Sequence, residues 1–304
     1  MRTHRIVIPT LMTVTLATGV ITPLQAEESG LADFTFIPQL AIQKKNLDFS
    51  QKYIGGSGNG LRGDFDADLP TISLAFTTVY KSMLFASLKY ETNFEDSYAN
   101  STAPFTNANS AIDRQDFNFT VGMNVWEGLN VFGGYISGTT EIEPMPTYIE
   151  FPGADNRSCV AQNSCTPTVI SNLAKDHQLQ GLGQYKQTYK ENGWFLGGSY
   201  GLSLLDTGTL SASLAYALMD GKYSDNYTVI GAVQDVSFNF EGDSKGLSLA
   251  LTWAAPLNNL LGYYVDLRTQ MYDMDASDKT GSFGGKVKTE ETITTLTAGL
   301  QMFL

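Results

Sequence analysis

The carboxy-terminal stretch TITTLTAGLQMFL places an apolar side chain at every second position from Leu296 to the last residue. Successive side chains of an extended strand point to opposite faces, so Leu296, Leu300 and Leu304 share one face. Thr295 and Thr297 lie on the other face. A strand of this kind fits both the half-buried sheet of a soluble sandwich and the wall of a membrane barrel. The pattern therefore predicts a strand but leaves its surroundings open.

Nine further segments alternate in the same way. In the most regular of them, Phe117, Phe119 and Val121 oppose Asn118 and Thr120. The nine segments are 33–43, 68–80, 83–95, 116–125, 129–140, 193–204, 209–220, 245–255 and 261–273. Alternating segments of about ten residues, separated by turn residues, are typical of transmembrane β-barrels. We therefore predict an all-β fold, a closed antiparallel barrel of ten transmembrane strands.

The links between these segments alternate between short and long. Short links lie at 80–83, 126–129, 205–209 and 256–262, and long polar stretches lie at 44–66, 97–113, 141–192, 222–242 and 274–288. In outer-membrane barrels short turns face the periplasm and longer loops face the outside. The even strand count then places both termini on the side of the short turns.

The amino-terminal residues predict export. Residues 1–26 begin with Arg2 and Arg5, continue as an uncharged and mostly apolar run, and end on Ala26. This order is typical of a secretory signal peptide. Residues 27–304 would then form a single barrel domain. They contain no second run of 18 apolar residues, so we expect no transmembrane helix.

The composition agrees with a sheet that has one face in lipid. Charged residues make up only 16% of the chain, against roughly 25% in typical globular domains. Glycine, phenylalanine and tyrosine are plentiful, with 29, 17 and 15 residues. The formal net charge of −12 argues against a nucleic-acid partner.

Taken together, the export signal, alternating strands, sorted loop lengths and terminal strand make the chain resemble a Gram-negative outer-membrane β-barrel protein. The resemblance is architectural and covers nearly all of residues 27–304. It implies location in the outer membrane, contact with its lipids and lipopolysaccharide, and recognition of the last strand by the barrel-assembly machinery. Barrels of this class usually end on Phe or Trp. This chain ends on Leu304, with Phe303 on the opposite face.

The strand count has one alternative. Residues 177–190 could form an extra strand with a partner from 143–175, which would give a barrel of twelve strands. We favour ten strands, with residues 177–190 projecting outward from the long third loop. At either count, a small barrel is filled largely by its own side chains.

Charged residues are predicted on the inner face of several strands. They are Lys89, Glu91, Asp116, Asp266 and Arg268. They could line a narrow, selective pore. They could also form a plug of ion pairs, because charges that avoid lipid must find partners inside the barrel. The tight interior of a ten-stranded barrel favours the plug.

Aromatic residues are expected at both membrane interfaces. Tyr80, Trp126 and Trp253 lie beside short turns, and Tyr90 and Trp194 lie toward long loops. Aromatic girdles of this kind mark the two interfaces of an outer-membrane barrel.

Cys159 and Cys165 are the only cysteines, and both lie in the predicted loop 141–192. A close pair in an exported chain predicts a local disulfide. A metal site is the weaker alternative, because no second thiol pair or histidine cluster accompanies these cysteines.

The run DFDAD raises the question of a metal. On an extended segment Asp64, Asp66 and Asp68 share one side and could bind Ca²⁺ through oxygen ligands. Solvated loop charges are the favoured interpretation. We predict no cofactor.

The predicted function is non-enzymatic: a structural or surface-interaction protein, or a narrow channel. One alternative is a porin-like diffusion pore. The other is a surface hydrolase, similar to the omptins or to outer-membrane phospholipases, built around His177. This is the only histidine after the signal segment. Omptins use an Asp-x-His arrangement, whereas here Asp176 directly precedes His177, and neighbours on a strand point to opposite faces.

Overall fold

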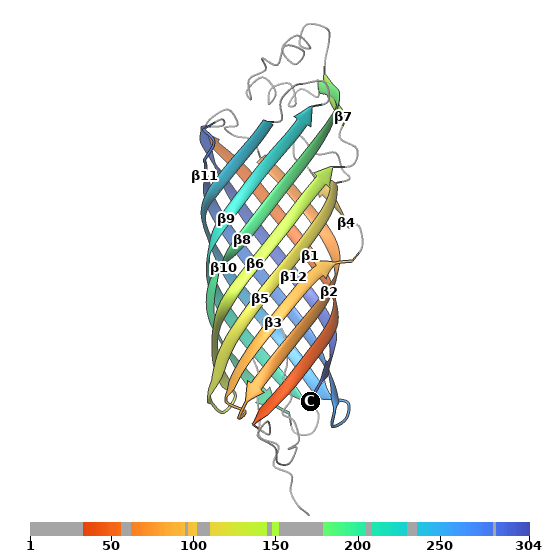
Figure 1. The fold of residues 1–304 in the computed structure, drawn as a ribbon, viewed down its shortest axis with the longest axis vertical. Coiled ribbons are helices and arrows are strands. Elements are labelled where there is room, and N and C mark those ends of the chain that lie inside the picture. The colour runs from red at the N-terminus through yellow and green to blue at the C-terminus, as the bar shows by residue number, and fades with distance from the viewer. Residues whose placement is uncertain are drawn as a thin grey trace, which may run out of the picture.

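The computed structural model describes residues 33–55, 62–94, 97–101, 110–144, 148–151, 179–204, 208–229, 236–281 and 284–304. Within these ranges the chain is a tall, closed β-barrel with strongly tilted strands (Figure 1). The strands are β1 (Phe34–Gly55), β2 (Arg62–Tyr80), β3 (Leu84–Asn93), β4 (Ser97–Ser101), β5 (Ser110–Trp126), β6 (Leu129–Pro144), β7 (Tyr148–Phe151), β8 (Leu179–Ser203), β9 (Thr209–Val229), β10 (Val236–Pro256), β11 (Leu261–Asp278) and β12 (Gly285–Met302).

Ten of these strands form the wall. The order is β1, β12, β11, β10, β9, β8, β6, β5, β3 and β2, and the pairing of β1 with β2 closes the barrel. The short β4 follows β3 in the chain and occupies the same position in the wall, because it pairs with the same two neighbours, β2 and β5. The short β7 pairs only with β8. The prediction of ten antiparallel strands is therefore confirmed, and residues 179–190 belong to the wall strand β8.

The carboxy terminus takes part in this closure. Leu304 continues the pairing beyond β12, because its amide donates to the Phe36 carbonyl and its carbonyl accepts from the Phe36 amide, each at 3.0 Å. Phe303 points inward and is buried, whereas Leu304 is 63% exposed on the outer face. The terminus lies at the end of the barrel that carries the short turns, which we call the turn end (Figure 1). We call the opposite end the loop end.

The predicted strand lengths are wrong at the loop end. Strands cover much of the stretches that we expected to be loops. These stretches are 44–66, 97–113, 222–242 and 274–288, together with residues 179–192 of the stretch 141–192. The inward and outward residues of β1 explain the difference. From Lys44 onward the outward positions become polar, as at Asn46 and Asp48, while Leu47 and Phe49 keep pointing inward. The alternation therefore continues with the apolar residues on the other face.

An apolar belt surrounds the half of the barrel near the turn end. Its outward side chains are exposed, and include Leu40, Ile42, Leu74, Phe76, Leu88, Phe117, Val121, Val131, Leu196, Leu214, Leu249, Leu251, Val265, Leu267, Leu296 and Leu300. Apolar side chains in contact with water over so large an area would be unfavourable, and a lipid-facing band of this kind is what defines a membrane barrel. The part of the chain that the structure describes contains no helix long and apolar enough to cross a membrane.

Inside the barrel, aromatic rings lie over glycines of the neighbouring strand. Tyr264 is directly opposite Gly299, and a Cβ on Gly299 would lie 2.4 Å from the Tyr264 ring. The same arrangement joins Phe85 with Gly122, Phe132 with Gly197, Phe195 with Gly134 and Tyr272 with Gly246. Each ring thus lies against the inner wall, which lets large side chains fit in a narrow barrel.

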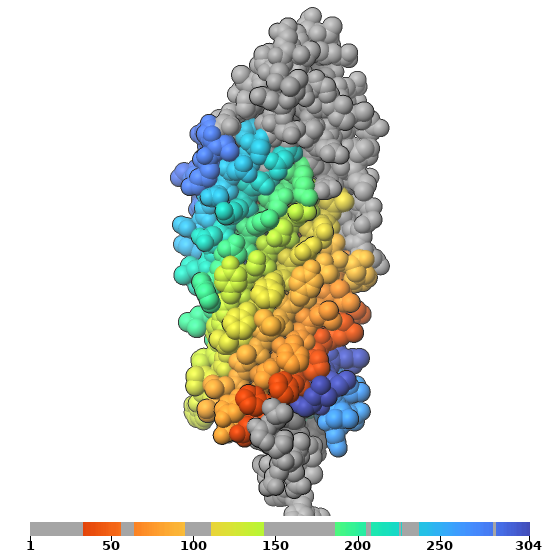
Figure 2. Space-filling view, in the orientation of Figure 1, coloured from red at the N-terminus to blue at the C-terminus, as the bar shows by residue number. Residues whose placement is uncertain are grey.

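The barrel is taller than a membrane requires. A strand of 22 residues such as β1 extends about 73 Å at 3.3 Å per residue, or about 50 Å along the axis at a tilt near 45°. The apolar band of an outer-membrane barrel is only about 25 Å tall. Figure 2 shows the continuous outer wall that the long strands form.

Candidate functional site: the charged interior of the barrel

The five charged residues predicted to face the lumen all lie inside the barrel. Their exposed fractions are 7% for Lys89, 7% for Glu91, 6% for Asp116, 1% for Asp266 and 5% for Arg268. Strands β3, β5 and β11 provide them, and in each strand their alternate neighbours face lipid. The alternation therefore placed these side chains, but it gave no information about their partners.

The sequence analysis missed four further buried charged residues, which are Lys45, Arg114, Glu191 and Glu291. Each lies in or beside a stretch that we predicted to be a loop. A signal was present near Lys45, because Leu47 and Phe49 share its phase along β1 and are buried.

Lys45 joins two strands through its ammonium group. Its Nζ lies 3.1 Å from Glu91 Oε2 on β3 and 2.6 Å from Asp116 Oδ2 on β5. Lys89 pairs with the same Glu91, and Gln43 Nε2 donates to Glu91 Oε1 at 2.6 Å. Both carboxylates therefore have several charged or polar partners.

Arg114 extends this network across the lumen. Its Nε lies 3.1 Å from Asp116 Oδ2, and its Nη1 lies 2.6 Å from Glu291 Oε1 on β12. The Nη1 group also donates to Thr140 Oγ1 at 2.9 Å. The network thus ties β1, β3, β5 and β12 together. We call its six charged residues the charged plug: Lys45, Lys89, Glu91, Arg114, Asp116 and Glu291.

The charged plug is balanced, with three cations and three carboxylates. Buried charges are unfavourable unless they are paired and hydrogen-bonded. Every member has at least one ion pair, and every member is at most 7% exposed. The arrangement is that of a packed interior.

Glu191 on β8 lies outside the charged plug. It accepts hydrogen bonds from the hydroxyl groups of Tyr189 and Ser244. Thr289 on β12 in turn donates to the Tyr189 hydroxyl at 3.5 Å. These contacts join β8, β10 and β12 inside the barrel. Among the described residues no lysine or arginine lies within 4.0 Å of the Glu191 carboxylate.

Asp266 and Arg268 form a separate pair on β11. Their closest atoms are 3.3 Å apart, and Thr252 Oγ1 donates to Asp266 Oδ1 at 2.6 Å. On the neighbouring strand β10, Ala250 is directly opposite Arg268 and Thr252 is directly opposite Asp266.

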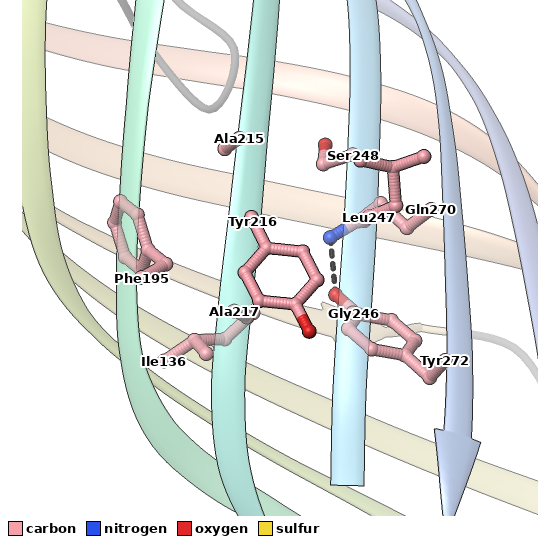
Figure 3. Close-up of a pocket in the computed structure, with 10 residues that line it drawn as sticks. All are labelled: Ile136, Phe195, Ala215, Tyr216, Ala217, Gly246, Leu247, Ser248, Gln270 and Tyr272. Carbon is pink, nitrogen blue, oxygen red and sulfur yellow. Dashed lines mark hydrogen bonds between the residues drawn. The ribbon is translucent and has the colours of Figure 1, made fainter.

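A small hollow lies on the inner wall formed by β6, β8, β9, β10 and β11 (Figure 3). Small residues such as Ala215, Ala217 and Gly246 leave this space, and the Tyr272 ring covers it from one side. Gln270 Nε2 donates to the Tyr272 hydroxyl at 2.5 Å. The volume is about 10 Å³, which is close to the minimum for one water molecule. The hollow is too small for a solute.

The predicted aromatic girdle residues lie on the wall of the barrel near the ends of the belt. Trp126 and Trp194 are 76% and 68% exposed, and Tyr90 is also exposed. Tyr80 precedes the tight turn between β2 and β3, and Trp253 is half-buried with its Nε1 3.5 Å from the Tyr263 hydroxyl. Trp194 and Tyr135 pack edge to face with ring centroids 5.4 Å apart.

Asp64, Asp66 and Asp68 lie on β2 and point outward above the belt. Asp68 is 3.0 Å from Lys44 Nζ and accepts from Asn46 at 3.2 Å. The hydrogen bond from Lys44 holds the pKa of Asp68 below its usual range. In the described ranges no three His, Cys, Asp or Glu side chains come together in a way that could hold a metal ion.

The signal segment 1–26, Cys159, Cys165 and His177 lie outside the described residues. The predicted disulfide, the cleaved signal peptide and the histidine-based alternative therefore stay predictions.

No protein family model matches the sequence, and no curated protein matches it. Several solved structures are similar to it. The outer membrane protease OmpT from Escherichia coli is 12% identical, with a TM-score of 0.56 over 89% of this chain and 96% of that chain. The translocator domain of the autotransporter NalP from Neisseria meningitidis is 10% identical, with a TM-score of 0.40 over 86% and 88%. The toluene transporter TodX from Pseudomonas putida is 9% identical, with a TM-score of 0.34 over 88% and 89%.

At sequence identities this low, structural similarity shows the fold alone and does not indicate a shared activity. The closed ten-stranded wall and the apolar belt lead to the same conclusion as the likeness to OmpT. The chain is a transmembrane β-barrel with the fold of Gram-negative outer-membrane proteins.

Proposed function

We propose that this protein is a non-enzymatic barrel that is closed to solutes and acts through the part of its wall above the membrane. The charged plug is the observation that carries the proposal. An aqueous pore would leave its lining charges in contact with water, whereas Arg114, Asp116 and Glu291 are at most 7% exposed. The ion pair between Arg114 and Glu291 crosses the lumen from β5 to β12.

The height of the barrel supports a role at the cell surface. Strand β8 has 25 residues and β9 has 21, whereas about 9–11 residues suffice to cross the membrane. The additional residues build a rigid wall beyond the belt. Exposed ion pairs join its neighbouring strands, as between Lys186 and Glu141 at 2.7 Å and between Lys222 and Glu241 at 2.8 Å. A wall of this kind is suited to contact with partners outside the membrane.

The porin-like alternative has less support. It requires water at the level of the charged plug, where the side chains are buried. The hydrolase alternative depends on His177, and the likeness to OmpT concerns only the fold. A narrow channel would need a rearrangement of the charged plug.

Conductance in a planar bilayer tests the proposal. We expect the purified full-length protein to give no conductance steps, because the ion pairs close the lumen. A stable open state of the wild-type protein would refute closure. The double variant Lys45→Ala/Arg114→Ala, checked for heat-modifiable migration as a sign of folding, should conduct. A matched double variant on the outer wall, Lys186→Ala/Lys222→Ala, should stay silent.

Activity assays test the enzymatic alternative separately. Turnover of peptide or phospholipid substrates that is abolished by His177→Ala would support the hydrolase and contradict the proposal. Silence in both assays leaves the surface of the barrel as the functional part of the molecule.

A further inference from the structure

Within the described part of the lumen, Glu191 on β8 is the only buried charged residue that has no ion pair. Nine charged residues are buried inside this part of the barrel, four of them cations and five of them carboxylates. Eight belong to the charged plug or to the pair of Asp266 and Arg268. Glu191 is the ninth and is 5% exposed. When it is ionised, the interior carries one uncompensated negative charge.

The two neighbouring strands bring no cation to Glu191. It is directly opposite Gly138 on β6 and Gly221 on β9, neither of which has a side chain. Met274 fills the space over Gly221, because a Cβ there would clash with the Met274 Sδ. The charged plug fills the space over Gly138, where a Cβ would lie 2.9 Å from Asp116 Oδ1. A thioether and a paired carboxylate therefore lie over the glycines on either side of Glu191.

Uncharged hydroxyl groups provide the contacts that Glu191 makes. The hydroxyl groups of Tyr189 and Ser244 both donate to Glu191 Oε1. They supply hydrogen bonds but no positive charge, and burial of a charge is costly unless the charge is both paired and hydrogen-bonded. An uncharged carboxylic acid keeps the capacity to accept such hydrogen bonds. The uncharged form of Glu191 therefore suits these two partners.

The charged and titratable groups that face Glu191 from the other strands do not compensate a negative charge on it. Glu291 on β12 is a like charge, and Arg114 on β5 is the nearby cation. Arg114 is already bound to Glu291 at 2.6 Å and to Asp116 at 3.1 Å. Tyr272 on β11 also faces Glu191, and a tyrosine is uncharged at neutral pH. The surrounding strands thus contribute uncharged groups, a like charge and a cation that is already paired.

We propose that Glu191 is a proton-binding site, occupied at neutral pH, and that its bound proton stabilises the contacts among β8, β10 and β12. Oε2 carries the proton, while Oε1 accepts the two hydrogen bonds from the hydroxyl groups. With this proton bound, the nine buried charged residues have no net charge. Release of the proton at higher pH places an unpaired negative charge near Glu291. The resulting repulsion acts across the lumen between β8 and β12.

The direction of the pH dependence follows from where the proton is released. In the unfolded chain a glutamate loses its proton near its ordinary pKa of about 4.3. The folded barrel holds the proton of Glu191 to a higher pH, and between these two values it binds more protons than the unfolded chain. The unfolding free energy then falls as the pH rises through this interval and becomes constant above it.

Infrared difference spectroscopy of the full-length protein in lipid vesicles tests for the proton directly. The wild-type minus Glu191→Gln spectrum at neutral pH should contain the carbonyl band of an uncharged carboxylic acid and no carboxylate bands. This band should disappear from the wild-type spectrum as the pH is raised. Glu241→Gln is the matched control, because Glu241 is an exposed glutamate on the outer wall, 2.8 Å from Lys222. Its difference spectrum should contain carboxylate bands alone.

Unfolding in urea tests the effect of the proton on the barrel. From about pH 5.5 to about pH 8.5, the wild-type midpoint should fall by about 0.5–1 M more than that of Glu191→Gln, which cannot ionise. Glu241→Gln should keep the wild-type pH dependence. Tyr189→Phe removes one hydrogen bond to the carboxyl group, so it should keep the acid band and move its frequency. This variant identifies the band if Glu191→Gln fails to insert.

Three results would overturn the proposal. The first is carboxylate bands in place of the acid band in the wild-type minus Glu191→Gln spectrum at neutral pH. The second is an equal fall of the urea midpoint in Glu191→Gln and in the wild-type protein. The third is a set of carboxylate bands that changes when sodium is replaced by potassium or when EDTA is added, since this would assign the Glu191 oxygens to a bound metal cation instead.

Discussion

Replacement of Arg114 by leucine tests the charged plug most directly. Arg114 is the ion-pair partner of Glu291, at 2.6 Å, whereas Asp116 keeps Lys45 as a second partner at 2.6 Å. Arg114→Leu would therefore leave the Glu291 carboxylate, 1% exposed, without its ion-pair partner. Removing one partner of a buried pair costs about 3–5 kcal/mol of unfolding free energy.

Urea unfolding in detergent or lipid, followed by tryptophan fluorescence and by heat-modifiable migration, measures this loss. With a slope of about 1–3 kcal/mol per M urea, the midpoint should fall by at least about 1 M. Lys186→Leu is the matched control, because it breaks the exposed pair with Glu141 at 2.7 Å. Exposed pairs contribute only about 0–1 kcal/mol.

A second variant distinguishes an unpaired charge from a packing defect. Arg114→Leu/Glu291→Leu removes both partners, and apolar replacement of a whole buried pair is often neutral or stabilising. The double variant should therefore recover much of the stability lost in Arg114→Leu. The reasoning is refuted if Arg114→Leu shifts the midpoint no more than Lys186→Leu, or if the double variant is less stable than Arg114→Leu.

Three further predictions concern the wall. A Cβ at Gly134 would lie 1.9 Å from the Phe119 carbonyl oxygen, so Gly134→Ala should lower the unfolding free energy by about 1–3 kcal/mol in the same assay. Lys44→Gln should raise the pKa of Asp68 toward the ordinary value of an aspartate, as measured by carboxyl NMR. Because the folded-state pKa of Asp68 is lowered, its pair with Lys44 stabilises the barrel at pH values above the unfolded-state pKa. This stabilisation is lost as the pH falls through the folded-state pKa. The variant lacks it and should therefore unfold at a higher pH on acidification. Leu304→Phe places an aromatic residue at an outward position next to lipid, and heat-modifiable migration should show insertion that is preserved or improved.

The strands were predictable from the sequence in the part of the wall that contacts lipid, because lipid requires apolar residues at alternate positions. Within the belt every outward side chain must be compatible with hydrocarbon, so residues such as Phe117, Phe119 and Val121 alternate visibly with inward polar residues. Above the belt that requirement ends. On β1 the outward residues become Lys44 and Asn46, and the strand continues to Gly55 with its apolar residues on the inner face. The strand count was therefore predictable and the strand lengths were not.

The same limit explains why the charged interior was found only in part. Inward charges such as Lys89 and Glu91 follow from the phase of a strand inside the belt. Their partners do not, because the pairing of Arg114 with Glu291 joins residues 177 positions apart. It depends on the register of β5 and β12 around a closed wall, and no local pattern specifies that register. Once the barrel closes, however, a buried carboxylate must find a cation, as Glu291 does, or hydrogen-bond donors, as Glu191 does. A buried charge recognised in sequence therefore predicts that a partner exists, and only the closed wall identifies which residue it is.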